Sequence, residues 1–219
     1  MIDITNVEVT GWEAAIRGMR NPMNSWNKSD TVYTDIDWFD EEMIQHKTDV
    51  PDIGPNDHDL MMKLAKAGSD HRKYLRMIHV SMDVDAPQYW WSQFDQYKIA
   101  TVTNSTSKMH KLHAKEFELS DFSTDYIAGD EVAMAYLNET IEFLNARREI
   151  YNSTGDKDAW YQMLQMLPMS YNQLRTVDLN YEVLRNIYFA RRGHKLDEWH
   201  TFCEWIETLP YHEFITEVE

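Results

Sequence analysis

The sequence is poor in cysteine and in glycine. Its single cysteine, Cys203, excludes an internal disulfide framework and fits a reducing compartment. The seven glycines do not cluster, so the GxxxxGK and GxGxxG loops that hold nucleotide phosphates are absent. No run approaches the roughly 20 apolar residues that cross a bilayer, and residues 1–9 lack the features of a secretion signal. We therefore expect an unprocessed cytoplasmic protein that does not engage a membrane.

Basic residues are also scarce. Lys and Arg number 21 against 37 Asp and Glu, which gives a formal net charge of -16 at pH 7. A surface that binds a nucleic acid duplex needs clustered positive charge, so this class of function is excluded. A pocket for one small phosphate needs only a few basic side chains and stays compatible with the composition.

Converging metal ligands are not seen in the sequence. His110 and His113 lie close together, as do His194 and Asp197, but a metal site needs three or four converging donors. Because there is no HExxH or paired-cysteine pattern, we interpret these histidines as surface residues and predict no metal site. Cys203 lies at helical spacing among apolar residues, and we interpret it as a small buried hydrophobic residue.

Aromatic residues, by contrast, are abundant. The chain has 8 Trp, 12 Tyr and 8 Phe, and such side chains serve cores, subunit interfaces and ring-stacking sites. Its 219 residues can bury a substantial core. With no internal repeat, low-complexity tract or Pro/Gly-rich linker, the sequence predicts a single domain over residues 1–219.

The most informative pattern lies in residues 76–110. Apolar and polar residues alternate from 78 to 85, which predicts a strand with one buried face. Asp85 followed by Ala-Pro predicts a helix start, and the helix is expected to run through Lys98 with many aromatic side chains. Hydroxyl and amide side chains then run from Thr101 to Lys108. They predict a loop that binds a polar ligand carrying an anion.

Helical and strand spacing predicts further elements on both sides. Before this stretch we expect a strand over residues 2–9, a helix over 12–20 and irregular chain over 21–55 with one helical turn near Glu41. A helix follows, capped by Asn56 and ended by Gly68. After a polar connection to about 128, helices are expected from Asp130 to before Gly155 and over 157–166, 181–191 and 196–208. A short strand over 174–179 and an Asn180 cap precede the helix at 181.

Several of these residues resemble the flavin-dependent thymidylate synthase family in type and spacing. In that family a strand ending in Ala-Pro leads into an aromatic helix, a Gln and a motif that begins Arg-His-Arg. Here Ala86-Pro87 and Gln93 hold the same offsets, and the motif falls without a gap on Gln96, Tyr97, Lys98, Thr101, Thr103, Asn104, Thr106, Lys108 and Met109. The family's later Leu-Pro, Asn and Arg correspond to Leu167-Pro168, Asn180 and Arg191, and Glu198-Trp199 is similar to its Gln-Trp. The resemblance covers most of residues 1–20 and 57–209.

The resemblance implies an α/β (α+β) fold with a central, mostly antiparallel sheet packed with helices, assembled as a homotetramer with sites shared between subunits. It implies FAD, NADPH and methylenetetrahydrofolate, and the methylation of carbon 5 of dUMP or a related pyrimidine nucleotide. The implied substrate-binding residues are Gln93, Asn104, Thr106, Lys108 and Arg191, of which Lys108 and Arg191 are also the implied catalytic residues. The implied cofactor-binding residues are Gln96, Tyr97, Lys98, Thr101 and Asn180. We expect the polar stretch and Arg191 to face one cavity shared between chains.

The chain departs from the family pattern at charged positions. Lys98 is the one positive charge at the Arg-His-Arg positions, Asn104 replaces the motif Glu, and Lys108 replaces the motif Arg. Glu182 stands where the family carries an Arg near the flavin, and the family's flavin-facing His, expected near Arg76, is missing. A lysine cannot copy the bidentate contact of an arginine with a phosphate. Two other hypotheses therefore stay open. One is a catalytically altered nucleotide-binding protein on the same fold, with tryptophans stacked on a base, and the other is a structural assembly protein with aromatic interfaces.

Overall fold

The computed structural model describes residues 1–33, 37–39, 45–47 and 50–217. The chain divides into two compact units. Unit 1 contains Met1–Thr5, Asp83–Gln96 and Thr103–Thr176, and unit 2 contains Asn6–Met82, Tyr97–Val102 and Val177–Glu219. The predicted mixed α/β fold is confirmed. That residues 1–219 act as a single domain stays a prediction.

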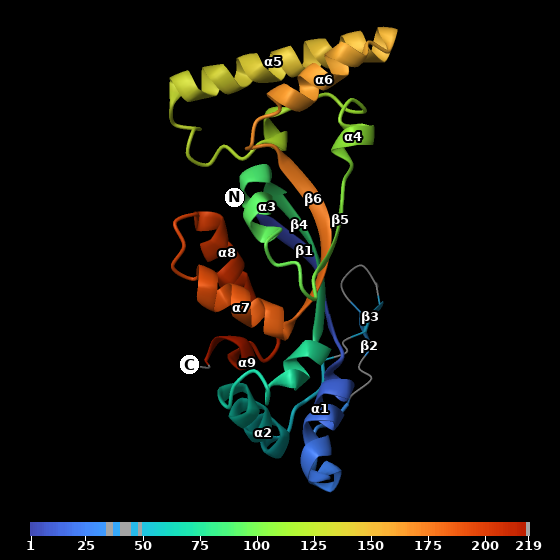
Figure 1. The fold of residues 1–219 in the computed structure, drawn as a ribbon, viewed down its shortest axis with the longest axis vertical. Coiled ribbons are helices and arrows are strands. Elements are labelled where there is room, and N and C mark those ends of the chain that lie inside the picture. The colour runs from blue at the N-terminus through green and yellow to red at the C-terminus, as the bar shows by residue number, and fades with distance from the viewer. Residues whose placement is uncertain (34–36, 40–44, 48–49, 218–219) are drawn as a thin grey trace. The chain divides into compact units, whose positions relative to one another are not determined.

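A four-stranded antiparallel sheet is the main β structure. Its strands are β1 (Asp3–Thr10), β4 (His79–Pro87), β6 (Asn172–Asn180) and β5 (Val102–Ser105), in the order β1-β4-β6-β5 (Figure 1). The strands predicted over 2–9, 78–85 and 174–179 are confirmed, and Ile78, Val80, Met82 and Val84 are fully buried as the alternation indicated. The loop expected over 101–108 is wrong at its start, because Val102–Ser105 is a strand of this sheet.

The stretch expected to be irregular contains regular structure. Two 3₁₀ turns form at Asn21–Met23 and Trp26–Lys28, and β2 (Asp37–Phe39) pairs antiparallel with β3 (Gln45–Lys47). These strands have only three residues each, which is too short for a periodic pattern to be detected. The helical turn predicted near Glu41 lies outside the described residues.

The aromatic helix is shorter than predicted at both ends. Helix α3 spans Gln88–Phe94, and Pro87 rather than Asp85 is its N-cap. A residue that precedes a proline is disfavoured in the helical region, so Ala86 stays extended and β4 continues to Pro87. The helix ends at Phe94, where the backbone amide of Asp95 bonds to the carbonyl of Trp91 at 2.9 Å. The helix predicted through Lys98 is therefore wrong in its last four residues.

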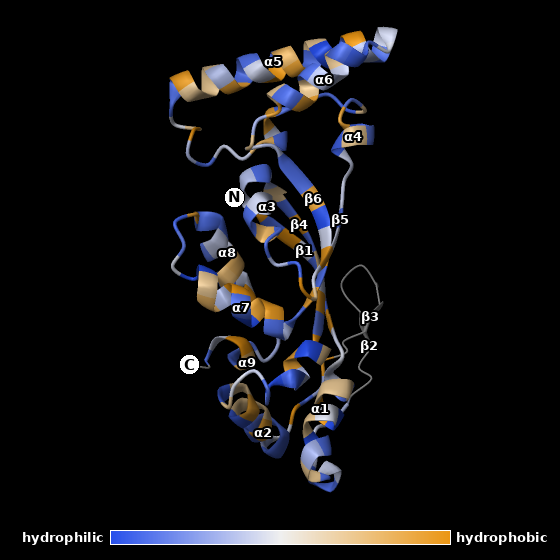
Figure 2. Cartoon of the chain, in the orientation of Figure 1, coloured by the Kyte–Doolittle hydropathy of each residue, from blue (hydrophilic) through white to orange (hydrophobic). Residues whose placement is uncertain are grey.

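Unit 1 also contains the helices α4 (Lys108–Lys111), α5 (Glu131–Thr154) and α6 (Lys157–Met166). As predicted, Asp130 caps α5 by accepting from the backbone amides of Val132 at 2.9 Å and Ala133 at 3.1 Å, and Gly155 ends the helix with φ 72°. Helices α5 and α6 lie side by side (Figure 1). Figure 2 shows hydrophobic residues alternating with hydrophilic ones along α5. The buried cluster that these two helices form with the chain before them consists of Leu112, Phe117, Phe122, Leu137, Ile141, Leu144 and Met163.

Unit 2 contains α1 (Trp12–Arg20), α2 (Pro55–Lys66), α7 (Tyr181–Arg191), α8 (Asp197–Ile206) and α9 (Glu213–Thr216). Helices α1 and α7 match their predicted ranges, and Asn180 caps α7 by accepting from the amide of Val183 at 3.1 Å. The helix predicted over 196–208 is confirmed as α8, which ends two residues early at Ile206, but it is not the last helix, because the short α9 follows it.

The prediction that Asn56 caps α2 is also wrong. The N-cap is Gly54, and Pro55 takes the first helical position. The side chain of Asp30 instead accepts from the amides of Asn56 at 2.9 Å and Asp57 at 3.0 Å. The helix is thus capped by a residue distant in sequence. It ends at Lys66, ahead of Gly68.

Candidate functional site

The predicted substrate residues of unit 1 are held by a buried glutamine on β6. Gln173 is 4% exposed. Its Nε2 donates to the carbonyl oxygen of Thr106 at 2.6 Å, and its Oε1 accepts from Gln88 Nε2 and from Arg175 Nε, each at 3.3 Å. Lys108 Nζ donates to Gln88 Oε1. This network fixes the backbone of Thr106 and the ammonium of Lys108, and the sequence patterns did not point to Gln88 or Gln173.

Arg175 connects this network to the aromatic helix. Its guanidinium carbon lies 4.2 Å from the ring centroid of Trp91, and its Nη1 donates to Asp95 Oδ1 at 2.7 Å. The indole nitrogen of Trp91 donates to the carbonyl oxygen of Gln173 at 2.8 Å. Arg175 is thus already paired with a carboxylate and a ring, so it orders the site rather than offering an uncompensated positive charge.

The tryptophans of α3 serve the core. Trp90 and Trp91 are fully buried, with Trp90 stacked on Phe94 at a centroid distance of 5.0 Å. The expectation that tryptophans stack on a base is therefore wrong for these two residues, because neither ring has a face exposed to a ligand.

A pocket of about 340 Å³ lies beside the network in unit 1. Thr106 and Lys108 line it together with Asp85, Ser107, Lys111, Leu112, Lys115, Glu116, Phe117, Asp121, Tyr171, Asn172 and Leu174. Lys115 Nζ is paired with Asp121 Oδ1 at 2.7 Å. The pocket therefore offers lysine ammonium groups and a serine hydroxyl to an anionic ligand, with carboxylates close to them.

Two titratable groups of this pocket have shifted pKa values. Burial, reinforced by the positive charge of Arg175, lowers the pKa of Lys108 below the ordinary lysine value. Burial, with the charges of Asp3 and Asp121, raises the pKa of Asp85. The environment thus disfavours charge at both groups, so a phosphate that stabilises the ammonium of Lys108 would gain an interaction that the free protein lacks.

The polar side chains that precede Lys108 in the sequence are exposed and available to a ligand. All four residues of β5, including Asn104, are exposed, and Thr106 is exposed beyond them. Within the described residues, the side chains of Asn104 and Thr106 make no hydrogen bond. Gln93 is half-buried on α3 and has an interaction within the chain.

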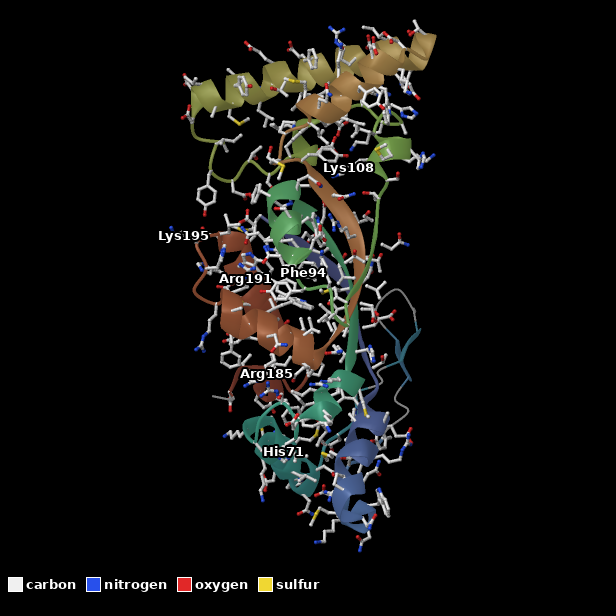
Figure 3. The ribbon with its side chains drawn as sticks, in the orientation of Figure 1. His71, Phe94, Lys108, Arg185, Arg191 and Lys195 are labelled. Atoms are coloured by element: carbon white, nitrogen blue, oxygen red, sulfur yellow. The ribbon has the colours of Figure 1, made fainter. Side chains whose placement is uncertain are left out.

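In unit 2, Arg191 lies against two aromatic rings. Its Nε donates to the hydroxyl oxygen of Tyr97 at 2.8 Å, and its guanidinium carbon lies 4.8 Å from the ring centroid of Trp199. Tyr97 and Trp199 meet edge to face at 6.1 Å. Figure 3 shows Arg191 on α7, the helix that also carries Arg185. The structure therefore brings together two residues that the resemblance assigned separately, Tyr97 to a cofactor and Arg191 to a substrate.

The other predicted cofactor residues differ in how freely they could bind a ligand. Lys98 and Gln96 are exposed, and within the described chain neither side chain makes a hydrogen bond or an ion pair. The hydroxyl oxygen of Thr101 is buried and has no hydrogen-bond partner among the described residues. Asn180 uses its side-chain oxygen to cap α7. Lys98 and Gln96 are therefore open to a ligand, whereas Asn180 is 4% exposed and its side-chain oxygen is already engaged.

The charge reversal at Glu182 is compensated within unit 2. Glu182 is buried, and Arg72 Nε donates to both of its carboxylate oxygens, at 3.1 Å and 2.9 Å. Nearby, burial and the charge of Arg72 lower the pKa of Arg185. The position where the resembling family has an arginine thus carries a neutralised ion pair and offers no positive charge to a phosphate.

The thiol of Cys203 is an unreactive group. Cys203 is buried as predicted, and burial with the charge of Glu207 raises the pKa of its thiol to about 11, so it stays protonated at neutral pH. The described residues contain no group of three or more His, Cys, Asp and Glu side chains that could hold a metal ion. None of the described helices combines the length and the apolar character needed to cross a membrane.

Comparison with known proteins gives matches only at the level of structure. No protein-family model matches the sequence, and no curated protein matches it. Two solved structures of flavin-dependent thymidylate synthase ThyX from Helicobacter pylori, both with FAD and dUMP, match with a TM-score of 0.68 and 14% sequence identity. Each match covers 99% of this chain and 100% or 98% of the bacterial chain. The chain therefore has the flavin-dependent thymidylate synthase fold, as the resemblance implied.

Proposed function

We propose that this protein is a flavin-dependent pyrimidine-nucleotide methylating enzyme. It methylates carbon 5 of dUMP, or of a related pyrimidine nucleotide, with methylenetetrahydrofolate as the carbon donor and NADPH as the source of reducing equivalents. We further propose that it acts as a homotetramer with sites shared between subunits. The observation that supports this most is the fold shared along almost the whole chain with proteins solved with FAD and dUMP.

In this proposal Lys108 and Arg191 supply the positive charge that binds the nucleotide. Lys108 lies in the unit 1 pocket with Thr106, and Arg191 is held by Tyr97 in unit 2. Gln93, Asn104 and Thr106 provide neutral donors and acceptors for the sugar and base. Donors aimed at the pyrimidine carbonyl oxygens stabilise an electron-rich, enolate-like form of the ring, in which carbon 5 is the nucleophile toward the incoming carbon. The chain's own contribution is thus binding and electrostatics, which agrees with the inert thiol of Cys203.

The donor set fits a flavin nucleotide. The unpartnered hydroxyl of Thr101 is a donor for a ligand, the exposed Gln96 adds an amide, and the exposed Lys98 is a cation for a phosphate. Tyr97 and Asn180 complete the proposed FAD-binding residues. When bound and reduced by NADPH, the flavin would supply the hydride that reduces the transferred methylene. The protein residues hold and orient it.

The second candidate function is a nucleotide-binding protein on the same fold in which this chemistry is lost. The ion pair between Arg72 and Glu182 favours it, because that pair leaves no free cation where the resembling family has an arginine. Charged hydrogen bonds to a phosphate contribute about 1.5–3 kcal/mol each, so the loss of such partners weakens binding of a diphosphate. FAD binding separates the two candidates.

Flavin retention is the direct experiment. The purified protein is incubated with FAD, freed of unbound ligand and examined for the visible flavin absorption band, and its melting temperature is measured with and without FAD and dUMP. The enzyme proposal expects bound flavin and a higher melting temperature with each ligand. Lys98→Ala should weaken FAD binding, whereas Lys66→Ala, at another exposed lysine, should not. A protein that dUMP stabilises but that never retains flavin would support the second candidate, and no response to either ligand would contradict both.

The lowered pKa of Lys108 predicts a pH dependence of nucleotide binding. A lysine whose pKa lies below the usual value of about 10.4 loses its positive charge earlier as the pH rises. Affinity for dUMP should therefore fall at a pH where an ordinary lysine would still be charged. In Lys108→Arg the guanidinium stays charged, so its affinity should not show this fall. Calorimetric titration of both proteins across the alkaline range tests this, and the comparison cancels the titration of dUMP itself. Parallel curves would exclude Lys108 from the site.

A further inference from the structure

Unit 2 contains a small pocket that the proposed nucleotide chemistry does not use. It has a volume of about 150 Å³ and lies between α1 and the chain that follows this helix. The pocket is lined by Glu13, Ile16, Arg17, Arg20, Trp26, Ser29 and Tyr33. None of these residues belongs to the proposed substrate-binding or cofactor-binding set.

Arg20, one of the residues that line the pocket, has a buried donor with no acceptor among the described residues. Arg20 is 3% exposed, its Nε donates to Asp57 Oδ1 at 2.6 Å, and its Nη1 donates to the carbonyl oxygen of Ser25 at 3.2 Å. Its Nη2 is buried and has no hydrogen-bond partner among the described residues. Buried polar groups are almost always paired in folded proteins, because an unmade hydrogen bond costs free energy. A ligand that brings an acceptor to Nη2 would remove that cost.

The walls of the pocket suit a planar ring. Trp26 and Tyr33 are about half exposed, at 50% and 49%, and the buried Ile16 adds an aliphatic surface. The indole nitrogen of Trp26 donates to Asn21 Oδ1 at 2.8 Å, so this side chain offers a ligand its ring rather than a donor. Cavities of about 150 Å³ hold one benzene ring in other proteins. The space and its lining thus fit a single six-membered ring.

The charges around Nη2 indicate a negatively charged acceptor. Both carboxylate oxygens of Asp57 already accept hydrogen bonds from other donors, and neither accepts one from Nη2 of Arg20. Arg17, at the exposed rim, has one ion pair among the described residues, with the exposed Glu13 at 3.3 Å. Burial, with the charge of Glu13, raises the pKa of Tyr33, so its phenol stays a donor at neutral pH. Two guanidinium groups and a phenol can therefore meet one carboxylate.

We propose that this pocket binds a small planar ring that carries a carboxylate. The carboxylate accepts from Arg20 Nη2 and the ring packs against Trp26 and Tyr33. The pocket shares no lining residue with the proposed nucleotide site, so the failure of one proposal leaves the other standing.

Fluorine NMR of para-fluorobenzoate added to the full chain tests the proposal. Saturable broadening of the ligand signal is expected. Para-fluorobenzyl alcohol keeps the ring but lacks the charge. Its affinity should be lower than that of the benzoate by a factor of about ten or more. Excess dUMP should not displace the benzoate. Equal binding of the alcohol or of uracil would overturn recognition of a carboxylate, and displacement by dUMP would overturn a separate site.

Variants at the exposed wall avoid disturbing the buried arginine. Trp26→Ala should weaken benzoate binding about threefold to tenfold, because it removes one ring contact. Tyr136→Ala is the matched control, since Tyr136 is an exposed aromatic residue on α5 of unit 1. Melting temperatures of both variants confirm that they are folded. No binding by the folded wild-type chain, or equal binding by Trp26→Ala, would overturn the proposal.

Discussion

Replacing Asp57 by alanine should lower the free energy of unfolding by about 3–5 kcal/mol, because it leaves a buried arginine without its counter-charge. Asp57 is fully buried on α2, and Arg20 on α1 is 3% exposed. Their contact of 2.6 Å is the central bond of the cluster. The carboxylate also accepts from four groups of Ser29, Asp30 and Thr31, at 2.6–3.1 Å. Those donors would all lose their acceptor in the variant.

Urea unfolding of the variant and of Asp59→Ala measures the effect. Asp59 is an exposed carboxylate on the same helix, so its removal should change the unfolding free energy by no more than about 0.5 kcal/mol. A loss of less than about 1 kcal/mol in Asp57→Ala would mean that water replaces the carboxylate, and that the pair contributes little to stability.

The same pair gives acid sensitivity with a defined sign. Burial raises the pKa of Asp57, but the hydrogen bonds from Ser29, Thr31 and Arg20 outweigh it and hold the pKa below the ordinary value. A carboxyl group whose pKa is lower in the folded than in the unfolded state stabilises the fold above the unfolded value of about 3.9. That stability is lost as the pH falls from this value through the folded pKa. The wild type should therefore lose more stability than Asp57→Ala on acidification over this range.

Elements with local signals could be predicted from the sequence. Helix α5 begins after Asp130 and ends at Gly155, and both residues act through their nearest neighbours in the chain. Strand β4 alternates fully buried residues with less buried ones because one of its faces packs against the core. In both cases the residues that define the element are neighbours in the sequence, so the pattern of residue types was enough to predict the element.

The failures have long-range causes. Strand β5 has four exposed side chains, so no buried face produces an alternation, and only pairing within the sheet defines it. The cap of α2 comes from Asp30, and no local pattern indicates a cap so distant in sequence. Gln173 holds Thr106 through a bond between residues 67 positions apart. The spacing of the motif pointed to Lys108 and Arg191, but the groups that orient them become visible only in three dimensions.

Replacing Arg191 by alanine should weaken dUMP binding by about 1–3 kcal/mol, which corresponds to roughly fivefold to 150-fold, because a charged hydrogen-bond donor is lost. The contact with Tyr97 at 2.8 Å and the ring of Trp199 at 4.8 Å hold the guanidinium in one orientation. Arg191→Lys keeps the charge but loses the planar fork, so it should recover only part of the affinity. Tyr97→Phe should weaken binding less than the alanine variant, since it removes only the orienting hydroxyl.

Arg192→Ala is the matched control for this experiment. Arg192 is the next residue along the chain, and its replacement by alanine removes the same charge. Its guanidinium carbon lies 4.8 Å from the ring centroid of Phe189, whereas Arg191 lies against Tyr97 and Trp199. Calorimetric titration with dUMP should give wild-type affinity for this variant, and melting curves show whether each protein is folded. If the two alanine variants lose the same affinity, the effect is one of net charge. Binding unchanged in Arg191→Ala would remove this residue from the nucleotide site, because a guanidinium in contact with a phosphate or a base cannot be deleted without cost.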